Sequence, residues 1–126
     1  MVKKILLIED EAELVELMKM RLEANGYEVD FAYDGEEGLK SIEDNRPDLV
    51  LLDIKIPKID GFEVCKIIKE SPATKDIPVV AISALAGKDL PNRCREAGAE
   101  VLLFKPIEAE KLLSKIKELL KKKEQG

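Results

Sequence analysis

The sequence has 126 residues, 45% of them hydrophobic, and a formal net charge of −5, which fits one compact domain over residues 1–126 with little room for a second. The negative charge argues against nucleic-acid binding, and the absence of histidine together with two widely separated cysteines argues against a zinc site. Only four apolar residues follow Lys3 and Lys4, too few for a signal peptide or a membrane span, so we expect a cytoplasmic protein with no membrane partner.

The first part of the chain predicts a strand, a helix and a second strand. The aliphatic run Ile5–Ile8 suits a buried strand. From about residue 12 to residue 24, apolar residues repeat every fourth position, as on one face of a helix: Leu14, Met18 and Leu22. Asn25 and Gly26 would end this helix, and residues 28–32 suit a short strand.

The middle of the chain predicts two helices on either side of a strand. Asp34, followed three residues later by Glu37, forms a capping-box pattern, which predicts a helix that ends at Arg46-Pro47. The run Leu49–Leu52 predicts a strand. Beyond a loop with Pro57 and Asp60-Gly61, a second helix is expected before the break at Ser71-Pro72. The residues expected to face inward are Leu39 and Ile42 on the first helix, and Val64, Ile67 and Ile68 on the second.

The last part of the chain predicts two further strand–helix pairs. Val79–Ile82 is followed by a small-residue stretch, 84–87, and then by a helix that begins near Asp89, because Pro91 fits only in a first turn. Gly98 would end that helix. After the strand Val101–Phe104, the last helix starts at about Ala109 and is expected to fray at Lys121–Lys123. Its lysines fit a solvated face better than a nucleic-acid patch, and its inward positions are Leu112, Leu113, Ile116, Leu119 and Leu120.

Five strands that alternate with five helices through short connections predict an α/β fold, a doubly wound parallel sheet with helices on both faces. In such a sheet the carboxyl ends of all strands lie along one edge, where open α/β folds bind their ligands. The side chains that directly follow four of the predicted strands are therefore the candidate site residues.

Those side chains are acidic, hydroxylic and basic: Glu9 and Asp10 after the first strand, Asp53 after the third, Ser83 after the fourth and Lys105 after the fifth. Each has an ordinary explanation on its own, as a helix cap, a solvated turn or a surface lysine. Together they predict a phosphoryl-transfer site. Carboxylates bind Mg²⁺, one of them can accept a phosphoryl group, and a hydroxyl and an ammonium group can hold phosphoryl oxygens.

Over essentially its full length, the sequence resembles a response-regulator receiver domain. The resemblance rests on Glu9-Asp10, on the segment DIKIPKIDG that begins at Asp53, on Ser83-Ala84 and on Lys105-Pro106. It implies a flavodoxin-like fold with strand order 2-1-3-4-5, which makes Asp10 and Asp53 neighbours. It also implies a cis peptide bond before Pro106.

The resemblance further assigns a role to each site residue. Asp53 would be the phosphoacceptor, and Mg²⁺ would be bound directly by Asp10, Asp53 and the backbone carbonyl of Lys55, with Glu9 acting through a metal-bound water. Ser83 would hydrogen-bond a phosphoryl oxygen. Lys105 would pair with the Asp53 carboxylate in one state and with the phosphoryl group in the other. In two positions the chain departs from many receivers: Leu102 replaces an aromatic residue on the fifth strand, which argues against a rotating aromatic switch, and Lys55 stands at the mouth of the site.

The resulting hypothesis is a stand-alone response regulator rather than an enzyme. Because the chain has no histidine, the phosphohistidine donor must be another protein, a histidine kinase or a histidine phosphotransfer protein. A relay intermediate and a switch for an unidentified protein target both remain open. The alternatives are a phosphohydrolase of the haloacid dehalogenase type, which would have a second Asp at position 55, and a flavodoxin-like flavin binder, whose phosphate the acids after the first strand would repel.

Overall fold

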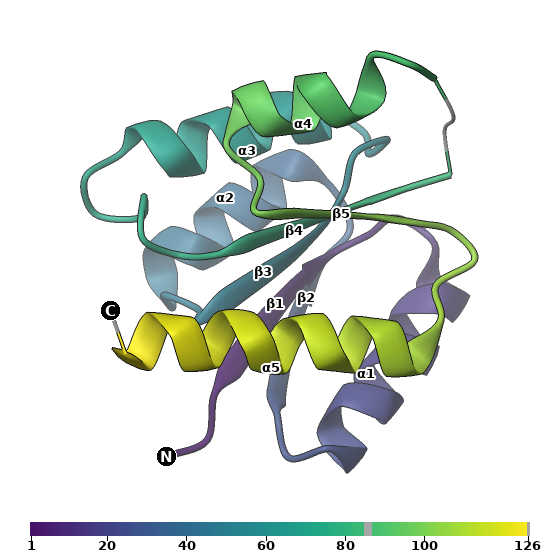
Figure 1. The fold of residues 1–126 in the computed structure, drawn as a ribbon, viewed down its shortest axis with the longest axis vertical. Helices are drawn as coiled ribbons and strands as arrows, with labels where there is room; N and C mark the ends of the chain where they lie inside the picture. The colour runs from purple at the N-terminus through teal and green to yellow at the C-terminus, as the bar shows by residue number, and fades with distance from the viewer. Residues whose placement is uncertain (85–86, 126) are drawn as a thin grey trace.

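The computed structural model describes residues 1–84 and 87–125 as an α/β fold with one parallel sheet. The elements in chain order are β1 (Lys4–Ile8), α1 (Ala12–Ala24), β2 (Glu28–Ala32), α2 (Gly35–Asp44), β3 (Leu49–Asp53), α3 (Gly61–Glu70), β4 (Val79–Ser83), α4 (Leu90–Ala97), β5 (Val101–Phe104) and α5 (Ala109–Gln125). The sheet has the order β2-β1-β3-β4-β5, and each neighbouring pair is parallel. This confirms the doubly wound, flavodoxin-like fold with strand order 2-1-3-4-5 (Figure 1).

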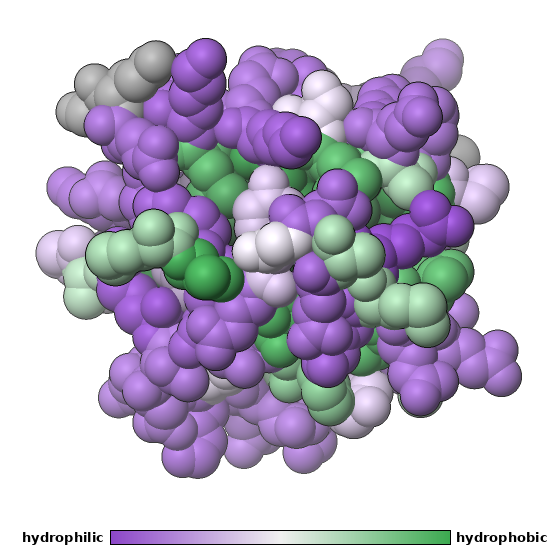
Figure 2. Space-filling view, turned by 90° about the horizontal axis from the view of Figure 1, so that it is seen from below, coloured by the Kyte–Doolittle hydropathy of each residue, from purple (hydrophilic) through white to green (hydrophobic). Residues whose placement is uncertain are grey.

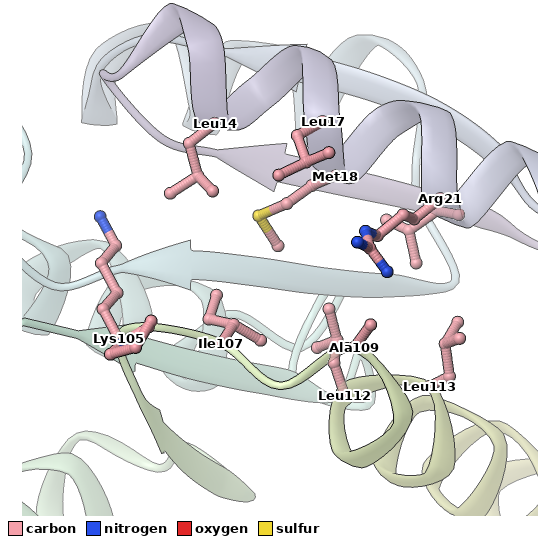
Figure 3. Close-up of a pocket in the computed structure, with 11 residues that line it drawn as sticks. Leu14, Leu17, Met18, Arg21, Lys105, Ile107, Ala109, Leu112 and Leu113 are labelled. Atoms are coloured by element: carbon pink, nitrogen blue, oxygen red, sulfur yellow. The ribbon is translucent and has the colours of Figure 1, made fainter.

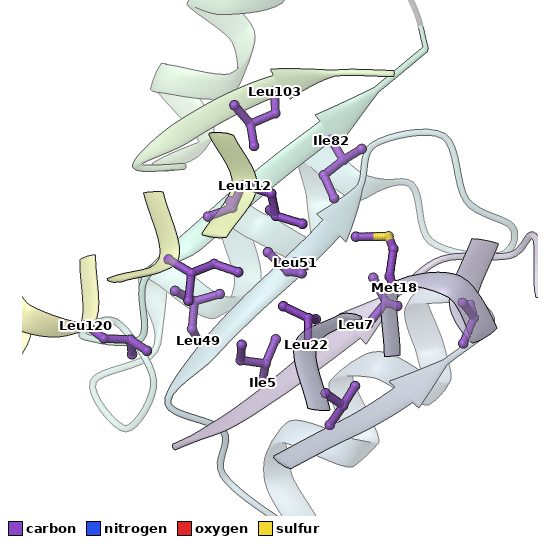
Figure 4. Packing of buried hydrophobic residues seen from close by; sticks show 14 residues of the cluster. Ile5, Leu7, Met18, Leu22, Leu49, Leu51, Ile82, Leu103, Leu112 and Leu120 are labelled. Carbon is purple, nitrogen blue, oxygen red and sulfur yellow. The ribbon is translucent and has the colours of Figure 1, made fainter. Parts of the chain in front are cut away.

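Helices cover the sheet on both faces. The cluster on one face joins the sheet to α1 and α5, and Figure 4 shows Leu51 of β3 between Leu22 of α1 and Leu112 of α5. The opposite cluster joins the sheet to α2 and α3, and a smaller one lies under α4. Every residue of β3 and β4 is buried, which explains why these strands are continuous aliphatic runs.

The predicted helix ends agree with the structure where a specific residue marks them. The Asp34 carboxylate accepts the Glu37 N–H at 2.8 Å at the start of α2, and Asp60 caps α3 in the same way through the Glu63 N–H at 3.0 Å. Gly98 follows α4 with a φ of 97°, a conformation that strongly favours glycine. The caps at Asp34 and Asp60 fix where two loops of the site edge end, and Gly98 fixes a turn at the opposite edge of the sheet.

Two predictions about the helices are wrong, and one falls outside the described residues. Ile67 is exposed rather than inward-facing, because Val64, Cys65 and Ile68 form the buried side of α3. Helix α5 does not fray at its lysines but continues to Gln125, and Glu124 near its end forms an ion pair with Lys3 at 3.1 Å. Of the small-residue stretch 84–87, residues 85 and 86 lie outside the described part.

Charged side chains dominate the surface, as expected for a chain with 37% charged residues. The face shown in Figure 2 is largely hydrophilic, with hydrophobic side chains gathered in breaks between the charged ones. Among residues 1–84 and 87–125, no helix combines the length and the apolar character that crossing a lipid bilayer requires.

Candidate functional site

The polar residues predicted from the sequence meet at the carboxyl edge of the sheet. The strand register places Ile8 beside Leu52 and Asp53 beside Ile82, so Glu9, Asp53 and Ser83 follow one another across three neighbouring strands. All three are buried, with exposed fractions of 0%, 4% and 1%, whereas Asp10 is exposed. Two carboxylates and a hydroxyl enclosed at one sheet edge are unusual in a core, which marks the edge as a functional site.

Lys105 reaches this cluster from the end of β5. Its Nζ lies 2.9 Å from Asp53 Oδ2, 2.8 Å from Glu9 Oε1 and 3.3 Å from Glu11 Oε1. The Lys105 backbone N–H donates to the Ser83 carbonyl at 2.8 Å, which extends the β4–β5 ladder to the site. The Lys105–Pro106 peptide bond is cis, as predicted. The predicted pairing of Lys105 with Asp53 is thus present, but Lys105 also contacts two further carboxylates.

The buried charges perturb one another. Burial raises the pKa of Glu9 to about 7, opposed by the contact with Lys105 and by the Glu11 N–H at 3.1 Å, and the neighbouring Asp53 raises it further. The Glu9–Lys105 contact at 2.8 Å offsets the effect of burial on the Glu9 pKa only in part. For Lys105 itself, burial disfavours the charge, but the contacts with Glu9 and Asp53 outweigh it and raise the pKa of the ammonium group.

Three carboxylates at this edge fit a divalent cation. Glu9, Asp10 and Asp53 can each offer one oxygen, and these oxygens all lie within 4.8 Å of one another. Hard oxygen donors with excess negative charge are the ligands that Mg²⁺ prefers, and Mg²⁺ usually keeps several waters, which the exposed Asp10 side of the site admits. The cluster therefore fits the expected metal, which would cancel the charge that Lys105 leaves uncompensated.

The loop after β3 is held in place by its own backbone. The Lys55 N–H donates to Asp53 Oδ1 at 2.9 Å, and the Gly61 N–H donates to the Ile54 carbonyl at 2.8 Å. A side chain at Gly61 would collide with Ile54, so this close approach requires glycine. The loop forms one wall of an open cavity of about 520 Å³ over the site, whose lining includes Asp10, Asp53, Lys55 and Lys105.

Beside the site lies a second, apolar groove of about 310 Å³ between α1 and α5. Figure 3 shows Leu14, Leu17 and Met18 of α1 facing Ile107 and Leu112 across it, with the Lys105 side chain at one end. Lys105 therefore lines both the groove and the acidic site.

One residue of this edge, Glu11, was not predicted from the sequence. The Glu11 carboxylate contacts Lys105, and the Glu11 N–H donates to the Glu9 carboxylate. Glu9, for which a role through a metal-bound water is expected, also contacts Lys105 directly. The only sequence signal for Glu11 was its place two residues after Glu9 in an acidic run.

Residues 5–117 match the family described as response regulator receiver domain. The chain belongs to this family. The receiver is 36% identical over 120 residues to the polar-differentiation response regulator DivK of Brucella anthropi, covering 95% of this chain and 98% of DivK. It is 35% identical to the DNA-binding dual master transcriptional regulator RpaA of Synechocystis, covering 94% of this chain but only 49% of RpaA. The receiver thus spans nearly the whole of one relative and about half of the other.

Solved structures agree with this assignment. A CheY-like receiver domain protein from Methanospirillum hungatei superposes with a TM-score of 0.93 at 31% identity, covering 99% of this chain and 98% of that one. The receiver domain of the sensor histidine kinase PA1611 from Pseudomonas aeruginosa, with a magnesium ion coordinated in its active-site cleft, superposes with a TM-score of 0.87 at 27% identity, covering 95% and 98%. The receiver is therefore a phosphoacceptor signalling module of two-component systems, and its three acids are consistent with such a magnesium site.

Proposed function

We propose that residues 1–126 form a stand-alone response regulator that accepts a phosphoryl group from phosphohistidine on Asp53, with Mg²⁺ as cofactor, in the cytoplasm. The observation that carries this proposal is the single ammonium group of Lys105 between the buried carboxylates of Glu9 and Asp53. The donor is a histidine kinase or a histidine phosphotransfer protein. The DivK relative, which this chain covers almost completely, supports a regulator without an attached output domain.

In the proposed reaction an Asp53 carboxylate oxygen attacks the phosphorus of phosphohistidine, a P–O bond forms, and the P–N bond breaks with its electron pair returning to the imidazole. Mg²⁺, bound by Asp10, Asp53 and the Lys55 carbonyl and through water by Glu9, would supply the positive charge that the equatorial oxygens require. Lys105, whose Nζ lies 2.9 Å from Asp53 Oδ2, would pair with an oxygen of the phosphoryl group on Asp53. Ser83 would hydrogen-bond another of these oxygens.

The groove between α1 and α5 is our proposed contact for the phosphodonor protein. The groove is apolar and adjoins the acidic site, and Lys105 lines both. A helix of the donor protein that docked in the groove would therefore place its phosphohistidine within reach of Asp53. Leu17 is 47% exposed on its rim. Replacing it by glutamate should slow transfer from a histidine donor protein while leaving transfer from a small-molecule donor unchanged, because the small donor needs no groove.

The test of the phosphoacceptor uses acetyl phosphate and Mg²⁺ with intact-mass detection. The parent should gain one phosphoryl group, Asp53→Asn should gain none, and a chelator should abolish the gain. Asp60→Asn is the matched control, since Asp60 is an acid of the same loop and asparagine still caps α3. Equal labelling of the parent and Asp53→Asn would overturn the assignment.

A further inference from the structure

We propose a second interaction surface: the open edge of β2 accepts an extended segment of another protein in which basic and apolar residues alternate. This surface, called the β2 edge here, consists of β2 and the side of α2 that faces it. It lies at the opposite side of the sheet from β4 and β5, and its outward-pointing side faces away from β1, which the acid cluster follows (Figure 1). The inference does not depend on phosphorylation.

The backbone of β2 presents unused hydrogen-bonding groups in a fixed direction. The Glu28 N–H donates to the Lys3 carbonyl at 3.0 Å, and the Ala32 carbonyl accepts the Glu9 N–H at 3.0 Å. The backbone groups of alternate residues, from Glu28 to Ala32, therefore face β1. In a parallel ladder the intervening residues then point their N–H and C=O groups away from β1. Those residues are Val29 and Phe31, and among the described residues no strand lies beyond them. Such an edge is a template for one further strand.

A groove runs beside this edge. It has a volume of about 570 Å³ and is bounded by β2 on one side and by α2 on the other. Its charged lining residues are Asp30, Glu37, Asp44 and Lys40, of which Lys40 is already paired with Asp44 at 3.2 Å. Asp30 is also paired, with Lys4 at 3.7 Å. Three carboxylates against two ammonium groups still leave the groove acidic. Side chains that point from an added strand toward α2 should therefore be basic.

The other side of the edge is aromatic. Phe31 and Tyr33 are 42% and 40% exposed, and their rings meet edge to face with centroids 5.3 Å apart. Phe31 alternates with Asp30 along β2, so its side chain points to the other face of the sheet, while the strand edge at Phe31 itself borders the groove. Side chains that point from an added strand toward this face should be apolar. Because successive side chains of a strand alternate between faces, the occupant needs alternating basic and apolar residues.

A second copy of this chain is a poor occupant. Pairing β2 with another β2 would bring Glu28 and Asp30 of one copy against the same acids of the other, and like charges on paired strands are destabilising. Acidic side chains on an edge strand are also a common device against self-association. The same carboxylates that discourage self-pairing favour a basic partner, so we infer that the occupant is a basic segment.

The test is a binding measurement with a blocked Lys-Val-Lys-Val-Lys-Val-Lys peptide and the full chain. Bound peptide should slow hydrogen exchange of the Val29 and Phe31 amides, which point outward, and leave the Asp30 amide, already bonded to β1, unchanged. A peptide with glutamate in place of lysine should not bind. Protection elsewhere, no binding of the lysine peptide, or equal binding of the glutamate peptide would overturn the proposal.

Variants separate the two halves of the surface. Asp44→Lys, which reverses a groove charge, should weaken binding on the order of tenfold, whereas Glu43→Lys, the same charge change outside this groove, should not. Phe31→Ser should also weaken binding, with Met20→Ser, another exposed apolar position, as its control. If instead the Val29 and Phe31 amides become protected with rising protein concentration and no peptide, the occupant is a second copy and the proposal fails.

Discussion

Glu9→Gln should stabilise the metal-free protein at neutral pH, because it removes a charge that folding buries. Burial holds the pKa of Glu9 at about 7, against an ordinary value of 4.5. Between these two pH values the folded state binds more protons than the unfolded state, so the parent loses stability as the pH rises. At about 1.4 kcal/mol per pH unit, the free energy of unfolding that the parent loses reaches about 3.5 kcal/mol above pH 7, and below pH 4.5 the loss vanishes.

Thermal melts in chelator measure this effect. At pH 8 Glu9→Gln should melt higher than the parent by roughly 10 °C, and at pH 4 the two should coincide. Glu11→Gln is the control, since it removes a carboxylate that also contacts Lys105 but is exposed to solvent, and it should change little at either pH. Added Mg²⁺ should raise the parent melting temperature more than that of Glu9→Gln. If the difference in melting temperature between Glu9→Gln and the parent does not vary with pH, the buried charge of Glu9 is not its cause.

Three further predictions concern parts of the fold around the site. Gly61→Ala should lower the free energy of unfolding, measured in urea, by about 2 kcal/mol or more, because the added Cβ would collide with Ile54. Gly87→Ala is the control and should change it little, because no atom lies within 4 Å of that added Cβ. Equal losses for the two variants would contradict the packing at Gly61. Asp34→Ala should cost about 1 kcal/mol by the same assay, and Asp34→Asn much less, since asparagine still caps α2. Burial raises the pKa of the Cys65 thiol to about 12. Alkylation of Cys65 at pH 8 should therefore be on the order of a thousandfold slower in the folded protein than in denaturant. Comparable alkylation rates in the two conditions would place Cys65 at the surface.

The sheet and the gathering of the site residues could be predicted from the sequence because both follow from strand ends. Continuous aliphatic runs such as Leu49–Leu52 specify buried parallel strands, and parallel strands bring Glu9, Asp53 and Ser83 to one edge whatever the loops do. The cap at Asp34 was predictable for a similar reason, since its hydrogen bond to Glu37 is local in the chain.

The pairing of Lys105 could not be predicted in the same way. Its ammonium group contacts the carboxylates of Glu9, Glu11 and Asp53, and the choice among them depends on side-chain torsions and on burial that sequence spacing does not encode. The exposure of Ile67 has a similar origin, because Val64, Cys65 and Ile68 form the buried side of α3 and Ile67 lies outside it, a choice that apolar spacing alone does not make. Local patterns thus predict elements and their ends, whereas the partners of a long side chain depend on the assembled edge.

Lys105 lines both the acidic site and the groove between α1 and α5. If a protein bound in the groove changes the position of the Lys105 ammonium group, then binding in the groove and the chemistry of the acidic site are thermodynamically linked, and the linkage is reciprocal. Suppose that the proposed phosphorylation of Asp53 changes the affinity of the groove for a protein by some factor. Binding of that protein must then change the equilibrium between free and phosphorylated aspartate by the same factor. A donor that binds the phosphorylated receiver more weakly than the free receiver would therefore, while bound, favour return of the phosphoryl group, so the position of the transfer equilibrium would depend on the ratio of these two affinities.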